Sequence, residues 1–464
     1  MERKLTYYTL FILLAIIGFQ GCKQKDWLDE KRDKSQVRPE TVKDFQAILD
    51  NVSWINGRFT NAGIAASNNV YLLDKDYATL LDREKQIYSW GMKPWDNTNG
   101  SAMEWDYGYA IIEYANIVLD GLSELKISGP EVENLKGQAY FYRAIGLYNL
   151  TTLFCRQYNP VNAGSEQGLP IRLTSDVNII IQRSSLKATM DQVINDCDEA
   201  ISKLDEIQSV TTRPSKPAAY ALQAKIRLNN GDYTGALTSA ENALKIKSSI
   251  LDFNSSQVSL NNTYRFPANG IGNEEILFFA FATMNGNIVR PTTTTKGIVD
   301  STLIKSYEDN DLRKTYFFIK SGTTYKFRGN YTGNFNNFSG LATNEVYLIK
   351  AECLARTSKT NEAISTLNTL LKKRYKAGKF VELTASSPED AINLILRERR
   401  KELPFTGNIP WEDIRRLNLD QKRQTTLSRV INGQTITLTP NNARYALPIP
   451  DAEIRLSGIE QNTY

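Results

Sequence analysis

The sequence contains no histidine, and it has only four cysteines and five methionines in 464 residues. The absence of histidine excludes a Ser-His-Asp triad, Cys-His catalysis and zinc sites that use histidine ligands. The cysteines show no spacing typical of a zinc site, and we predict no metal and no cofactor. Carboxylate-based chemistry stays open.

The sequence also lacks a strong excess of either charge. Lysine and arginine number 56 against 51 aspartate and glutamate residues, which gives a formal net charge of +5. Because no basic tract concentrates the positive charge, we expect no nucleic-acid partner. After residue 22 no apolar run is long enough to span a membrane. The length suits two or three domains, and 41% hydrophobic residues can form a sizeable core.

The N-terminus has the pattern of an export signal. Arg3 and Lys4 give it a positive start, and Leu10–Ile17 is an apolar run too short to span a bilayer comfortably. A glycine directly before Cys22 resembles the cleavage box of bacterial lipoproteins. We therefore expect a signal peptide at 1–21 and a lipid-modified Cys22, whose buried acyl chains anchor the mature chain. The alternative is an ordinary secretory signal with a chance cysteine.

The mature chain keeps three cysteines, Cys155, Cys197 and Cys353. An odd number does not make a disulfide framework. Cys197 lies in a helical apolar stripe and Cys353 in a predicted helix, so we interpret both as core thiols.

Pro217–Lys247 has the pattern of two helices joined by a turn, because small and apolar residues recur at helical spacing on both sides of Asn-Asn-Gly-Asp. The pattern resembles a tetratricopeptide repeat. Glu345–Tyr375 repeats the pattern, because Ala351 and Ala363 have the same spacing as Ala224 and Ala236 of the first pair. One pair cannot bury its apolar face alone. We predict a mainly α fold: a tetratricopeptide-like helical-repeat scaffold with long irregular loops and a few short strands, including a hairpin at Val430–Leu438.

Two long stretches, Asp50–Ala102 and Ser248–Thr343, lack helical periodicity and are rich in Asn, Gly and aromatic residues. Long loops of this kind are more often functional than filler. Sugar rings stack their apolar faces on aromatic side chains, while Asn binds their hydroxyls. The ligand-binding candidates are Trp90, Trp95, Asn97, Tyr325, Tyr331 and Phe335. The alternative for each is an ordinary core position, which is what we expect for Trp105 on its helical stripe.

Five stretches, taken in order along the chain, resemble one known family. They are WLDEKRDKS, QAYFYRAIGLYNL, EVYLIKAECLAR, ILRERRKELPFTGNIPWEDIRRLN and ALPIPDAEI. Together they resemble the RagB/SusD family of outer-membrane nutrient-uptake lipoproteins. The fourth stretch is the most specific, although it has Thr406 and Pro410 where the family usually has Glu and Arg. Its matching residues are Glu398, Arg399, Glu402, Leu403, Phe405, Gly407, Trp411, Asp413, Arg415 and Arg416.

The resemblance implies four tetratricopeptide-like helix pairs with long loops packed on one side. It divides the mature chain into a SusD-like N-terminal helical region at 22–247, a loop-rich region with short strands at 248–343 and a RagB/SusD C-terminal region at 344–464. It also implies a lipid-anchored position on the outer face of the outer membrane. There such proteins cap a SusC-like TonB-dependent transporter and deliver an oligosaccharide, or in some branches a peptide.

We predict no catalytic residue. Glu398 and Glu402 lie one helical turn apart beside arginines, an arrangement that suits ion pairs, whereas glycoside hydrolysis needs two carboxyl groups in a cleft. Arg399 falls in an apolar stripe and should pair with a carboxylate, because an unpaired buried charge is costly. The predicted function is non-catalytic nutrient binding and delivery. The alternatives are a helical-repeat scaffold lipoprotein that binds only proteins and, as a minor one, an all-α glycosidase.

Overall fold

The computed structural model describes residues 39–92, 103–126 and 128–464. The chain divides into two compact units, Met1–Thr41 and Val42–Tyr464, and the elements below belong to the second. In the described part of the chain, no helix combines the length and the apolar character that a membrane span requires. The predicted signal peptide and Cys22 lie outside the described residues.

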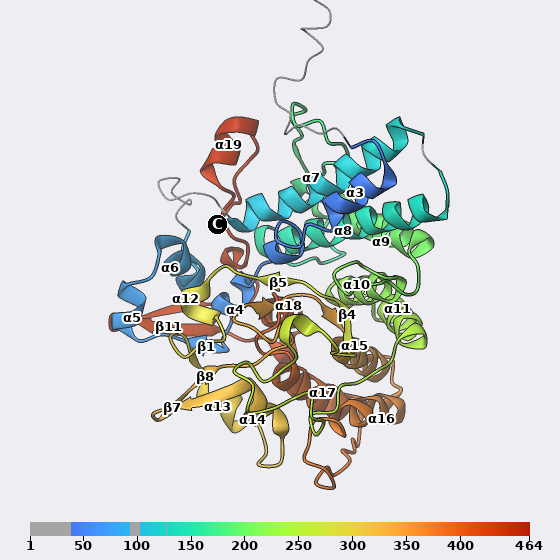
Figure 1. Ribbon diagram of the computed structural model, residues 1–464. Coiled ribbons are helices and arrows are strands. Elements are labelled where there is room, and N and C mark those ends of the chain that lie inside the picture. Colours follow the sequence, from blue (N-terminus) through green and yellow to red (C-terminus); the bar gives the residue numbers. More distant parts are fainter. Residues whose placement is uncertain (1–38, 93–102, 127) are drawn as a thin grey trace, which may run out of the picture. The chain divides into compact units, whose positions relative to one another are not determined.

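Long helices form the scaffold of the second unit (Figure 1). They are α7 (Met103–Glu124), α8 (Pro130–Phe154), α9 (Leu186–Lys203), α10 (Lys216–Asn229), α11 (Tyr233–Ile246), α15 (Thr343–Arg356), α16 (Thr360–Leu371) and α17 (Pro388–Glu402). Each of α7 to α11 packs on the next in the chain, and α15 packs on α11, α16 and α17. The mainly α fold and the predicted pairs α10–α11 and α15–α16 are confirmed.

The α10–α11 pair shows why these residues form a tight helix pair. Gly231 takes φ +79° in the turn, a conformation that favours glycine. Asp232 then caps α11 by accepting a hydrogen bond from the Gly235 N–H at 2.9 Å. Ala224 and Ala236 are fully buried, and their small side chains let the two helix backbones approach closely.

Shorter helices fill much of the two stretches that we predicted to be irregular, so that prediction was wrong in part. Helices of four to eight residues carry too little periodicity to be recognised in a sequence, and tertiary packing holds them. Within the two stretches they are α4 (Ala62–Ala66), α5 (Asp74–Ala78), α6 (Asp82–Ser89), α12 (Gly286–Val289), α13 (Ser301–Lys305), α14 (Leu312–Phe317) and the 3₁₀ helices η1 (Asn56–Arg58) and η3 (Ala268–Gly270). Other short helices of the described chain are α3 (Val42–Leu49), α18 (Ile409–Leu417), α19 (Asp451–Ser457) and the 3₁₀ helices η4 (Gln421–Arg423) and η5 (Ala443–Tyr445).

The strands of the described residues form small antiparallel pairs. These are β1 (Val70–Tyr71) with β6 (Ile298–Val299), β2 (Gln167–Pro170) with β3 (Arg183–Ser185), β4 (Ile276–Phe278) with β10 (Leu341–Ala342), β5 (Phe281–Ala282) with β9 (Asn337–Phe338), β7 (Phe318–Ser321) with β8 (Thr324–Phe327), and β11 (Leu427–Ile431) with β12 (Gln434–Leu438). The predicted hairpin is β11–β12. Asn432 and Gly433 turn it with φ of +50° and +76°.

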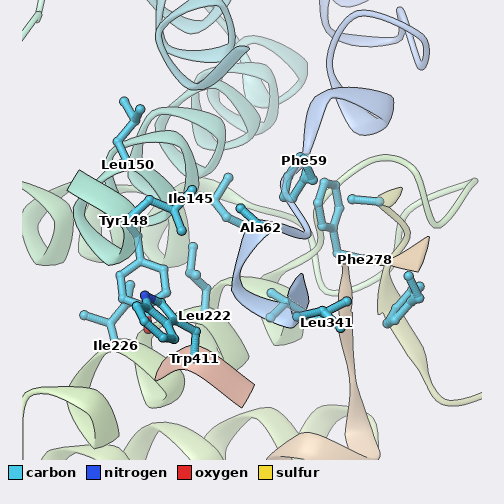
Figure 2. Close-up of a cluster of buried hydrophobic side chains, with 14 of the residues drawn as sticks. Phe59, Ala62, Ile145, Tyr148, Leu150, Leu222, Ile226, Phe278, Leu341 and Trp411 are labelled. Carbon is cyan, nitrogen blue, oxygen red and sulfur yellow. The ribbon is translucent and has the colours of Figure 1, made fainter. Parts of the chain in front are cut away.

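The loops share one hydrophobic core with the scaffold helices. Figure 2 shows side chains from α4, α8, α10, β4, β10 and α18 meeting in one cluster. Gly63 of α4 packs closely on α18, because a Cβ there would lie 2.8 Å from the Trp411 Cβ. The loops are therefore held on the helices by packing.

Cys155, Cys197 and Cys353 are buried free thiols, which confirms the prediction of core thiols at Cys197 and Cys353. Burial raises the pKa of Cys155 to about 11.

Candidate functional site

An exposed stack of three side chains lies where the first loops meet α7. Trp54 is 47% exposed, and the Arg58 guanidinium lies over its ring with Cζ 3.5 Å from the ring centroid. The same Cζ lies 4.5 Å from the ring centroid of Tyr107 at the start of α7. Stacking uses the faces of a guanidinium and leaves its in-plane N–H groups to a ligand. Within the described residues, no hydrogen bond or ion pair engages them.

The backbone under this stack is fixed by buried contacts of η1. Asn56 donates hydrogen bonds from Nδ2 to the carbonyl oxygens of Thr212 and Phe279, at 2.9 and 2.8 Å. Gly57 packs so tightly that a Cβ there would lie 2.9 Å from the Phe281 Cζ. Trp54 and Arg58 flank this buried anchor, so the rings are presented from a rigid base.

A second exposed ring lies on the loop that leads into β9. Phe335 is 47% exposed, and the Arg290 Cζ lies 5.4 Å from its ring centroid. The loop is shaped by Asn330, whose Oδ1 accepts hydrogen bonds from the Thr332 N–H and hydroxyl at 3.0 and 2.6 Å. Arg290 donates from Nη2 to the Thr283 carbonyl oxygen at 3.4 Å.

Strand β5 connects the two stacks. Phe281 of β5 touches Gly57, β5 pairs with β9 next to Phe335, and Thr283 directly after β5 binds Arg290. We refer to the two stacks together, Trp54, Arg58, Tyr107, Arg290 and Phe335, as the loop face. It combines exposed aromatic rings with guanidinium donors, an arrangement that suits the apolar faces and hydroxyl groups of sugars.

An acidic group lies next to this stack on α7. Asp106 precedes Tyr107, and its pKa is raised by partial burial and then by repulsion from Glu453 and Glu104.

The sequence candidates do not gather at one site. Phe335 is exposed on the loop face, and Tyr325 is half-buried on β8 opposite Lys320. Trp95 and Asn97 lie outside the described residues. Trp90 and Tyr331 are corrected here, because both are core side chains.

Trp90 is 3% exposed and donates from Nε1 to the Ala66 carbonyl oxygen at 2.9 Å. Tyr331 is 5% exposed, and its hydroxyl donates to a Glu275 carboxylate oxygen in a buried network. Burial raises the pKa of Tyr331 well above its usual value. Neither ring offers a free face to a sugar, so we no longer propose either as a ligand contact.

Sequence reasoning missed Trp54, Arg58 and Tyr107. Two signals were present. The first is that Trp54 and Arg58 lie four residues apart in a stretch without apolar periodicity. The second is that Tyr107 falls off the apolar helical stripe to which the buried Trp105 belongs. Trp105 is 2% exposed, which confirms its predicted core position.

The charged C-terminal motif forms a buried ionic network. Glu398 accepts from Arg313 at 2.6 Å and pairs with Lys401 at 3.2 Å, while Glu402 binds Arg313 at 3.2 Å and Arg374 at 2.8 Å. These side chains are at most 1% exposed. The predicted ion pairs of the two glutamates are confirmed, and the carboxylates lie away from any surface that a glycan could reach.

Arg399 behaves as predicted for a charge in an apolar stripe. It is 1% exposed and donates from Nε to Asp413 at 2.8 Å and from Nη2 to Glu345 at 3.2 Å. Asp413 also binds Arg416 at 2.8 Å. The motif therefore joins α15, α17 and α18, and its role is structural.

Comparisons with known proteins agree with this architecture. A family model described as "Starch-binding associating with outer membrane" matches residues 26–228, and the model of the SusD family matches residues 341–464. The SusD-like protein P2 of Formosa agariphila is 23% identical over 517 residues, covering 96% of this chain and 97% of that protein.

Two crystal structures show the same fold. A SusD superfamily protein from Bacteroides thetaiotaomicron has a TM-score of 0.73 at 22% identity, covering 91% of this chain and 100% of its own. A SusD-like carbohydrate binding protein from Bacteroides vulgatus has a TM-score of 0.66 at 19% identity, covering 90% and 97%. With the two family models at its two ends and this fold between them, the chain belongs to the SusD family.

Proposed function

We propose that this protein is an outer-membrane surface lipoprotein that binds a saccharide on its loop face and delivers it, chemically unchanged, to a TonB-dependent transporter. The observation that carries the proposal is the loop face itself, where Trp54 and Phe335 each expose about half of an aromatic ring beside a guanidinium group. The names of the matching family model and of the Bacteroides vulgatus relative support a saccharide over a peptide.

The proposal that the protein is not an enzyme rests on how its paired carboxylates are used. Glu398 and Glu402 are both buried and bound to Arg313. A glycosidase needs one carboxyl group to protonate the leaving oxygen and a second to act on the sugar ring, both facing the substrate. The two glutamates of the motif face arginines instead.

Family membership supports the proposed anchor and transporter, and one surface feature supports a protein partner. Val177 and Ile180 on the β2–β3 loop are 68% and 64% exposed, and Leu456 on α19 is 80% exposed. The two segments are tied by a hydrogen bond from Gln182 Nε2 to the Ser457 carbonyl oxygen at 3.2 Å. Exposed aliphatic side chains on adjoining segments suit a protein partner.

The proposed lipid anchor is tested separately. Replacing Cys22 by Ser should release the protein from the membrane fraction.

The saccharide proposal is tested with the variant Trp54→Ala/Phe335→Ala. An aromatic side chain of about 200 Å² that is half exposed has roughly 90 Å² to offer, which corresponds to about 2 kcal/mol when a sugar covers it. We expect the double variant to bind saccharides at least tenfold more weakly than the parent in affinity electrophoresis. Circular dichroism should show intact helices.

Tyr464→Ala is the matched control, because Tyr464 is 49% exposed and is not one of the loop-face residues. It should bind like the parent. Parent-like binding by Trp54→Ala/Phe335→Ala would refute the loop face as the site. Release of reducing sugar by the purified parent would refute the non-catalytic role.

A further inference from the structure

Within the described residues, two arginines on the loops that lead to η3 and β9 lie together without a carboxylate partner. Arg265 precedes η3, and its side chain packs over Gly329, where an added Cβ would lie 3.1 Å from the Arg265 Cγ. Arg328 follows β8, and its Cζ lies 5.1 Å from the ring centroid of Tyr264. The Nε atoms of both arginines are buried and have no hydrogen-bond partner among the described residues.

The two guanidinium groups repel each other. Partial burial and the positive charge of Arg328 both lower the pKa of Arg265. The hydrogen bonds of Arg265 go to the carbonyl oxygens of Leu260 and Asn262, and no carboxylate of the described chain pairs with either arginine. The loops thus hold two like charges together without compensation.

Some arginines of the described chain pair with a carboxylate, whereas Arg415 and Arg429 are held by backbone carbonyl oxygens. Arg143 binds Asp196 at 2.6 Å, and Arg374 binds Glu275 at 2.6 Å. Arg265 and Arg328 are two neighbouring guanidinium groups, and within the described residues neither has a carboxylate partner. An anion-binding site needs cationic side chains that have no counter-charge until the ligand binds.

The pair belongs to the same two loops as the aromatic ring of the loop face. Asn334, next to Phe335, donates from Nδ2 to the Asn269 Oδ1 at 2.9 Å, and the Asn269 N–H donates to the Thr332 carbonyl oxygen at 2.7 Å. Arg290 over the Phe335 ring also has no carboxylate partner among the described residues, and it donates to the Thr283 carbonyl oxygen instead. Arg265 lies on the loop before η3 and Arg328 on the loop before β9, so each of the two joined loops carries a guanidinium group.

We propose that the saccharide bound by this protein is anionic, and that Arg265 and Arg328 form the subsite for its carboxylate or sulfate groups. This inference rests on the proposed saccharide-binding function. A guanidinium binds a carboxylate or sulfate through parallel N–H···O bonds that gain strength from the opposite charges. The hydroxyl groups of a neutral glycan carry no charge and would leave the repulsion between the two arginines in place.

The test uses the full-length protein in non-ionic detergent and affinity electrophoresis through gels that contain polysaccharides. One arm holds uronate polymers, each beside its carboxyl-reduced form. A second arm holds sulfated polymers, each beside its desulfated form, so the arms distinguish carboxylate from sulfate. A third arm holds neutral glucans and galactans. We expect an acidic polymer to retard the parent and its neutralised form to do so at least tenfold less.

The variant Arg265→Gln/Arg328→Gln should weaken that retardation about tenfold or more, because each lost charged hydrogen bond accounts for roughly a tenfold change. The matched control is Lys245→Gln/Arg455→Gln, which removes the same charge from exposed positions on α11 and α19 and should behave like the parent. Arg328→Lys keeps the charge but loses the planar fork, and it should also weaken binding. Thermal unfolding followed by circular dichroism verifies each variant.

The outcomes separate the two proposals. Retardation by neutral polymers alone, unchanged in Arg265→Gln/Arg328→Gln, would overturn the anionic subsite and leave the saccharide-binding function standing. Equal weakening in Lys245→Gln/Arg455→Gln would show unspecific charge attraction and would also overturn the subsite. No retardation by any polymer would overturn both proposals.

Discussion

Removing the buried charge of Arg313 should destabilise the protein more than almost any other single substitution that leaves the surface unchanged. Its side chain is fully buried and binds Asp311 at 2.7 Å, Glu398 at 2.6 Å and Glu402 at 3.2 Å. Arg313→Met keeps most of the volume but leaves these three carboxylates with Lys401, Arg374 and the partly exposed Arg397 as the cations nearby among the described residues. Breaking a buried ion pair in this way costs about 3–5 kcal/mol. Typical domains have about 5–15 kcal/mol of stability in total.

Urea unfolding followed by circular dichroism measures the effect. The matched control is Lys187→Met, which removes a cation from an exposed pair with Asp191, where both side chains are more than half exposed. Exposed pairs contribute about 0–1 kcal/mol, so the control should unfold close to the parent midpoint. If Arg313→Met also unfolded within about 0.5 kcal/mol of the parent, the structural reading of the C-terminal motif would be refuted.

Three further predictions concern stability. Burial raises the pKa of Glu352, but the attraction of Arg416 and a neighbouring arginine outweighs burial and holds this pKa at about 2. The ionised Glu352 therefore stabilises the fold above about pH 4.5, and this stabilisation is lost as the pH falls toward 2. In acid titrations of unfolding, Glu352→Gln should reduce the acid-dependent loss of stability by about 3 kcal/mol. Gly63→Ala would place a Cβ 2.8 Å from the Trp411 Cβ and should cost about 1–3 kcal/mol in urea unfolding. Trp90→Ala should cost about 3–5 kcal/mol, while the folded fraction keeps parent-like saccharide affinity; a specific loss of affinity would restore Trp90 as a ligand contact.

The parts of the fold that sequence could predict are those whose cause is local. The α10–α11 pair has a long apolar period and a turn that needs Gly231, and the β11–β12 hairpin has Asn432 and Gly433 at its turn. Each signal lies within about thirty residues. The short helices α4 and α6 have no comparable signal, because packing against distant segments holds them.

The ligand-facing residues could not be predicted in the same way. Trp90 and Trp54 both lie in the first aromatic loop stretch, but Trp90 is covered by the Arg429 guanidinium, whose Cζ lies 4.9 Å from its ring centroid. Trp54 remains 47% exposed although the Arg58 guanidinium lies over its ring. Which aromatic ring becomes core and which becomes surface depends on segments far apart in the sequence.

The most direct test of the central claim is to map where a saccharide touches the protein. An oligosaccharide that carries a photoreactive group is irradiated with the purified protein, and the cross-linked peptides are identified by mass spectrometry. The loop face predicts cross-links on the peptides that contain Trp54, Tyr107 and Phe335, reduced by excess unlabelled saccharide. Cross-links confined to the scaffold helices α10, α11 and α16 would contradict the account.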